Sequence, residues 1–236
     1  MSTPYTTILA AAEVAAHLDD PQWVIVDCRF DLLDTAAGEQ RYAESHIPGA
    51  VYAHLDRDLS GARQPTGEGG RHPLPSPVEL TRTFGRWGIG RGVQVVAYDD
   101  QSGHYAARLW WLMRALGYRP PRLLNGGYAG FLATGAVSQT TAPQAQSIAP
   151  AAVTGFTGYC DINGLGDAQS RGALLIDSRE PRRYAGLEEP IDPVAGHIPG
   201  AINRPWQGVT GNAGEVLDTA GLQAHWGDAL AAEQLV

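Results

Sequence analysis

The sequence predicts an α/β fold made of two related units, each with a mainly parallel sheet flanked by helices. The first observation is a repeat: the residues HIPGA occur at 46–50 and again at 197–201. In each copy a short apolar run that ends in Asp-x-Arg precedes them, which is typical of a buried parallel strand. The second observation is that further apolar runs alternate with segments of helical periodicity, as in α/β units. Finally, 236 residues suffice for two domains of ordinary size.

The first elements expected along the chain are a helix and a buried strand. Residues 8–18, ILAAAEVAAHL, have helical apolar spacing, and we expect a helix that is entered from Thr6 or Thr7 and ends before Pro21. The apolar run VIVD at 24–27 is expected as a strand that leads into the first HIPGA.

The rest of the first unit carries clear boundary signals. Ser76, Pro77 and Glu79 form the pattern of a capping box with proline at the first helical position, and Gly88 follows the end of that helix. VQVVAYDD is then expected as a strand, DQSGH as a turn, YAARLWWLMRAL as a helix that stops at Gly117, and RLLNGG as a last short strand. In such a sheet the ligand site lies beyond the carboxyl ends of the strands.

The domain boundaries follow from composition. Residues 138–153 are polar, contain proline and have no periodicity, which indicates a linker. The first domain is therefore expected at 1–137 and the second at 154–236. The second contains its strand, its HIPGA and a helix in DTAGLQAHWGDALAAEQ.

The second unit is expected to be incomplete at its C-terminal end. In the first unit Gly49 lies 50 residues before Asp99, so the position matching Asp99 after Gly200 falls near residue 250, beyond Val236. The final residues LV are then the first two of a strand equivalent to VQVVAY.

Composition excludes several classes of function. The net charge of −8 argues against a nucleic-acid or anionic membrane surface, while a small anionic ligand stays possible. Two cysteines are too few for a disulfide framework. The amino terminus lacks a basic segment, and Glu13 interrupts its apolar run, so we expect neither a signal peptide nor a membrane span and place the protein in the cytoplasm.

The paired Asp-x-Arg and HIPGA units, together with RHPLP, the YD after a strand, AARLWWLMRALGY and LLNGGY, resemble the tandem rhodanese family of thiosulfate and 3-mercaptopyruvate sulfurtransferases. The resemblance implies a catalytically silent first domain and an active second domain with a cysteine in a Cys-x-x-Gly-x-x turn. Backbone N–H groups at a helix terminus lower the pKa of that thiol. The thiolate takes a sulfur atom from a small anionic donor as a persulfide and passes it to a thiophilic acceptor such as cyanide. No metal or organic cofactor is implied.

The same resemblance assigns the site residues. Asp99 occupies the cysteine position of the first unit, where a carboxylate cannot accept sulfur, and the nucleophilic cysteine is expected beyond Val236, so the printed chain should be inactive. An acid/base pair or metal site at Asp99 and Asp100 is disfavoured, because no His/Cys cluster accompanies them. Arg183 matches the family's donor-binding arginine, the alternative being a surface ion pair. Arg179 is the second substrate-site residue, with a bracing role as the simpler interpretation.

The cysteines and the HIPGA histidines are interpreted as structural residues. Cys28 and Cys160 lie away from the expected turn, and His46 and His197 occur in both the silent and the active unit, which favours loop hydrogen bonding. The stretch EEPIDPVAGHIPG lacks the second arginine of the mercaptopyruvate enzymes, which favours thiosulfate as donor. A non-catalytic rhodanese-like binding module is the alternative function.

Overall fold

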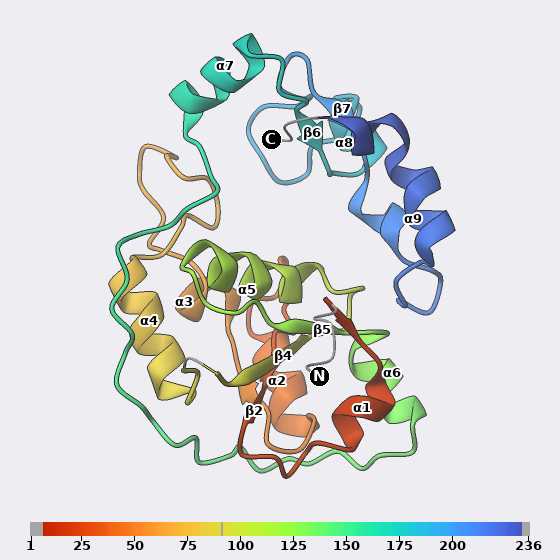
Figure 1. The fold of residues 1–236 in the computed structure, drawn as a ribbon. Helices are drawn as coiled ribbons and strands as arrows, with labels where there is room; N and C mark the ends of the chain where they lie inside the picture. The colour runs from red at the N-terminus through yellow and green to blue at the C-terminus, as the bar shows by residue number, and fades with distance from the viewer. Residues whose placement is uncertain (1–6, 91, 233–236) are drawn as a thin grey trace. The chain divides into compact units, whose positions relative to one another are not determined.

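The computed structural model describes residues 7–90 and 92–232 (Figure 1). The chain divides into two compact units, with the division between Gly158 and Tyr159.

Unit 1 contains a five-stranded sheet in which every strand pair is parallel. Its strands are β1 (Ile8–Leu9), β2 (Trp23–Asp27), β3 (Val51–Tyr52), β4 (Gln94–Tyr98) and β5 (Arg122–Leu124), in the spatial order β1-β5-β4-β2-β3. The central strand β4 is buried along its whole length. The predicted parallel α/β architecture is confirmed for this unit.

Helices cover both faces of this sheet (Figure 1). The strands alternate their side chains between two cores, one on each face. The helices are α1 (Ala11–Ala15), α2 (Ala37–Glu44), α3 (Leu55–Asp58), α4 (Pro77–Arg86), α5 (His104–Ala115) and α6 (Gly127–Ala133). One core joins Val95 and Ala97 of β4 to the buried side chains of α4 and α5. The other joins Val96 and Tyr98 to α1 and α6.

Two local predictions in unit 1 need correction. The helix expected at 8–18 is wrong at its start: Ile8 and Leu9 form β1, because they pair with Leu123 and Leu124 of β5, and the helix covers only Ala11–Ala15. The helix after Ser76 begins as predicted, with Pro77 in its first turn, but the serine side chain makes no capping hydrogen bond.

The stretch expected as a linker, 138–153, runs along unit 1. Gln139 and His46 exchange backbone hydrogen bonds of 2.9 Å, and the N–H of Ile148 donates to the carbonyl of Gly85. Val153 packs against the larger core. The division between the compact units therefore falls a few residues after this stretch.

Unit 2 has a small sheet of two parallel strands. Its elements are α7 (Ile162–Ser170), β6 (Ile176–Asp177), α8 (Pro181–Tyr184), β7 (Ile202–Asn203), α9 (Thr219–Trp226) and two 3₁₀ helices, Trp206–Val209 and Gly227–Ala231. Helix α7 was not predicted. The final predicted helix is divided at Gly227, which has a φ of +50°. The final LV, expected to begin a strand, lies outside the described residues.

Candidate functional site

In the loop after β4, four backbone N–H groups surround one point, and the side chain of Asp99 from the same loop occupies it. Asp99 is fully buried, and its Oδ1 accepts hydrogen bonds of 2.8 Å from the N–H groups of Gln101 and Gly103. Its Oδ2 accepts from Tyr105 and Ala106 at 2.9 and 3.0 Å. The loop is thus an anion cradle at the amino terminus of α5, and the bound anion is the Asp99 carboxylate.

The backbone of this loop explains how the donors converge. Ser102 is the one non-glycine residue with positive φ in the described part of the chain, at +64°, and Gly103 follows at +86°. Consecutive left-handed residues turn successive N–H groups toward one point. Asp99 thus sits where the resemblance places a cysteine, inside the kind of cradle that would stabilise a thiolate.

Beneath the cradle, Asp27 at the end of β2 organises the strand ends. Its carboxylate pairs with Arg29 at 2.7 Å, and Arg29 also donates to the carbonyl of Ser45. The hydroxyl of Tyr98 donates to Asp27 at 2.6 Å and accepts the N–H of Ile47 at 3.2 Å. Burial and the adjacent Asp27 carboxylate raise the pKa of Tyr98, so this hydroxyl keeps its proton.

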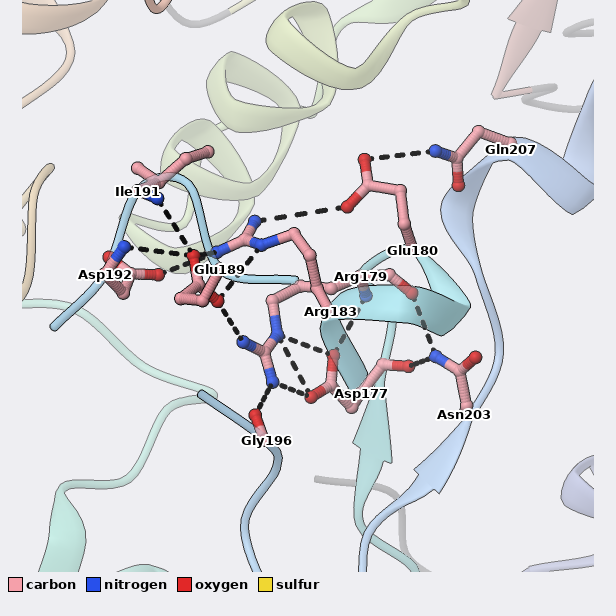
Figure 2. Close-up of polar contacts among 10 residues, drawn as sticks. All are labelled: Asp177, Arg179, Glu180, Arg183, Glu189, Ile191, Asp192, Gly196, Asn203 and Gln207. Carbon is pink, nitrogen blue, oxygen red and sulfur yellow. Dashed lines mark hydrogen bonds and ion pairs between the residues drawn. The ribbon is translucent and has the colours of Figure 1, made fainter. Parts of the chain in front are cut away.

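Unit 2 has the same local arrangement around its Asp-x-Arg. Arg179 pairs with Asp177 through two nitrogens and donates to the carbonyl of Gly196 at 2.6 Å (Figure 2). Gly196 precedes the second HIPGA as Ser45 precedes the first. The hydrogen bond from Arg179 holds the pKa of the Asp177 carboxyl below its ordinary value, because it stabilises the charged form.

The histidines of the two HIPGA copies also have matching contacts. His46 stacks on Tyr42 and His197 on Tyr184, with ring centroids 4.0 and 3.8 Å apart. In each pair the imidazole Nδ1 lies 2.7 Å from the carbonyl oxygen of the same tyrosine. These contacts fit the interpretation of both histidines as loop-bracing residues.

The structure reveals one correspondence that the sequence reasoning missed. Arg41 and Arg183 each stand directly before the stacking tyrosine, in QRYA and RRYA. In unit 1, Arg41 reaches the cradle loop, where its Nη1 lies 3.4 Å from Asp100. The Arg-Tyr pair that both units contain is the sequence signal from which this correspondence could have been found. It places Arg183 at the position from which an arginine contacts the loop that follows the central strand.

In unit 2, Arg183 is held by acidic side chains (Figure 2). Its Nε and Nη2 donate to the two oxygens of Glu189 at 3.2 and 2.8 Å, and Nη2 also donates to Asp192 at 2.8 Å. Glu189 is additionally 3.4 Å from Arg179, so the structure brings both predicted substrate-site arginines to one carboxylate. These hydrogen bonds lower the pKa of Glu189 to about 2, the bond from Arg183 being the largest cause.

A cleft of about 600 Å³ opens beside β6. Its walls include Leu175, Asp177, Gly196 and Ile198. The residues of unit 1 that match Asp177 and Ile198 are Asp27 and Ile47, and both form hydrogen bonds with the hydroxyl of Tyr98. In the described part of the chain, β6 pairs only with β7, so its other edge borders this cleft.

Neither cysteine lies in such a loop. Cys28 is buried, and burial raises the pKa of its thiol well above the ordinary value, whereas Cys160 is exposed. Among the described residues no group of three or more His, Cys, Asp or Glu side chains is placed to hold a metal ion. The helices in that same part of the chain are all too short or too polar to cross a membrane.

A parallel sheet whose central strand ends in an anion cradle at a helix N-terminus defines an α/β protein of the anion-binding kind, and the comparisons assign this one to the rhodanese fold. The rhodanese-like domain family matches residues 10–134. The crystal structure of the 3-mercaptopyruvate sulfurtransferase SseA from Escherichia coli superposes with a TM-score of 0.77 at 27% identity, covering 94% of this chain and 83% of that one.

Sequence relatives lead to the same family. A Pseudomonas aeruginosa protein named "Probable 3-mercaptopyruvate sulfurtransferase" is 44% identical over 202 residues, which are 82% of this chain and 69% of the relative. The "Thiosulfate sulfurtransferase" of the same organism is 33% identical over 210 residues, 84% of this chain and 69% of that protein. The chain belongs to the rhodanese family of sulfurtransferases.

Proposed function

We propose that this chain is the donor-binding part of a two-domain sulfurtransferase that works through a cysteine persulfide. The matching geometry of the two Asp-x-Arg sites supports the tandem arrangement. Among the described residues β6 pairs with β7 alone, which supports an incomplete second domain. The position of Arg183, which matches the arginine that reaches the cradle loop in unit 1, is the observation that carries the proposal. Unit 1 is silent because Asp99 fills its cradle.

Sulfur transfer needs a cysteine thiolate in a cradle of backbone N–H groups, and neither Cys28 nor Cys160 lies in one. A thiolate in a cradle like that of unit 1 attacks the outer sulfur of the donor, and the bond between that sulfur and the rest of the donor breaks. The bonding electrons leave with the sulfite or pyruvate fragment. Cyanide or another thiol then removes the sulfur and restores the thiolate. Arg183 binds the anionic end of the donor, since a guanidinium pairs with carboxylate or sulfonate oxygens.

The donor is 3-mercaptopyruvate in our leading proposal, which revises the preference for thiosulfate drawn from the sequence. The name of the 44% identical relative supports this revision. Thiosulfate stays the second candidate, because the loop between Tyr184 and His197 contains no arginine and a thiosulfate sulfurtransferase is also a relative.

The test compares two chains in a cyanide-dependent thiocyanate assay with each donor. The 236-residue chain should give no turnover above the uncatalysed rate. A chain extended by the reading frame beyond codon 236 should be active, and Arg183→Gln in that chain should reduce kcat/KM at least about 100-fold, as loss of a buried charge-assisted contact does. Turnover by the 236-residue chain would contradict the proposal. An in-frame stop after codon 236 would favour the non-catalytic binding module.

A further inference from the structure

The two units differ most in the loop before HIPGA. Three residues separate Tyr42 from His46, whereas twelve separate Tyr184 from His197. The longer loop, residues 185–196, is here called the acidic loop, because it contributes both Glu189 and Asp192 to Arg183. The corresponding arginine of unit 1 receives its carboxylate from the cradle loop instead, through Asp100.

The acidic loop takes the hydrogen-bond donors that an anionic ligand would use. Two of the three nitrogens of Arg183, Nε and Nη2, already donate to Glu189 and Asp192. The third, Nη1, makes only a long contact of 4.0 Å with Glu180 among the described residues. Glu189 is also well anchored: its side chain is 5% exposed and accepts the backbone N–H groups of Ile191 and Asp192. The paired edge of the guanidinium is therefore occupied.

The charges around Arg183 decide whether a further anion can bind there. Around the two arginines, 179 and 183, stand four carboxylates, those of Asp177, Glu189, Asp192 and, at 4.0 Å, Glu180. The cluster is thus not a cationic patch while the acidic loop is in this position. An added anion at Arg183 either replaces one of these carboxylates or adds a further negative charge beside them, and repulsion between like charges disfavours the second outcome.

We propose that the acidic loop is a gate on the donor site, in which the Glu189 carboxylate competes with the donor anion for Arg183. Glu189 is then a determinant of donor affinity that acts through the arginine. This inference rests on the proposed function in one respect only, the role of Arg183 as the anion-binding residue. The gate predicts a gain of anion affinity when Glu189 is neutralised, whereas a carboxylate that only orders the loop predicts a loss.

The experiment titrates thiosulfate into the ¹⁵N-labelled 236-residue chain and follows the Arg183 Nε–Hε resonance, assigned by its absence from Arg183→Lys. Glu189→Gln should tighten thiosulfate binding about fivefold or more, the change that loss of one ion pair makes. Asp192→Asn, which leaves the bidentate partner in place, should tighten it less. Glu188→Gln is the matched control. Glu188 lies in the same loop but pairs with Arg182 at 2.6 Å, so this substitution should change the affinity less than twofold.

The outcomes separate the gate from the function on which it rests. If Arg183→Gln abolishes binding while Glu189→Gln leaves it unchanged or weaker, the gate is wrong and Arg183 keeps its proposed role. If Arg183→Gln leaves the thiosulfate affinity of the Glu189→Gln chain intact, both are wrong. Equal gains in Glu188→Gln and Glu189→Gln would also overturn the gate, because they would reflect net charge alone.

Discussion

Replacement of Asp99 by asparagine tests the self-filled cradle of unit 1 directly. Asp99 accepts four backbone N–H groups, two at each carboxylate oxygen, and is fully buried. The substitution hardly changes side-chain volume. Whichever way the amide of asparagine is turned, its NH₂ group faces two backbone N–H donors that then lack an acceptor.

The expected magnitude follows from those two donors. Leaving a buried donor unsatisfied costs about 1–3 kcal/mol. Two such donors give roughly 2–4 kcal/mol, since a small shift of the loop recovers part of the loss. We therefore expect Asp99→Asn to lower the free energy of unfolding of unit 1 by this amount. Urea denaturation followed by near-ultraviolet circular dichroism measures it by linear extrapolation.

The neighbouring residue offers a matched control for this prediction. Asp100→Asn makes the same chemical change one position later, where the carboxylate is partly exposed and pairs with Arg41 at 3.4 Å. Such a pair contributes at most about 1 kcal/mol. If Asp99→Asn destabilises the protein no more than Asp100→Asn does, the four N–H contacts are not what holds the loop, and the cradle interpretation is refuted.

Three further predictions concern the two strand-end sites. Tyr98→Phe removes the hydroxyl between Asp27 and the N–H of Ile47 and should cost about 1–3 kcal/mol of unfolding free energy in urea. Glu189 has its pKa lowered from 4.5 to about 2, so its stabilising pairing is fully present above pH 4.5 and is lost as pH falls through about 2. A carboxyl NMR titration with its midpoint above pH 4 would contradict this. Backbone amides of β6 should exchange with deuterium at least about 100-fold faster than those of β4, because β6 borders an open cleft. Equal protection of the two strands would show that this edge is covered.

The sequence was most informative where one local pattern decides one element. The buried strand at Gln94–Tyr98 and the helix at His104–Ala115 match the predicted segments, because an uninterrupted apolar run and a helical apolar face each bury against the same core. It failed at Ile8 and Leu9, where helical spacing predicted the wrong state. Their strand depends on hydrogen bonds with residues more than 110 positions away, and no local pattern encodes such a partner.

The candidate site shows the same limit in its polar contacts. Arg183 was chosen from a motif, and the structure does place it beside Arg179 at the strand end. Its partners Glu189 and Asp192 were invisible, because the loop that carries them follows no helical or strand period and reaches the arginine only through its folded shape. The capping box predicted at Ser76 was also wrong in its contacts: the residue types match the pattern, but the serine side chain makes no capping hydrogen bond.

The comparison of Arg41 with Arg183 shows how an internal repeat separates scaffold from function. What both units share, the Asp-x-Arg pair and the Tyr–His stack, holds the strand ends in place in each of them. What differs is the partner of the equivalent arginine: Asp100 of the cradle loop in unit 1, and the acidic loop in unit 2. A difference built onto a shared frame is where selection for a particular ligand can act, since the frame itself does not need to change. Donor preference should therefore respond to substitutions in residues 185–196 while the fold does not.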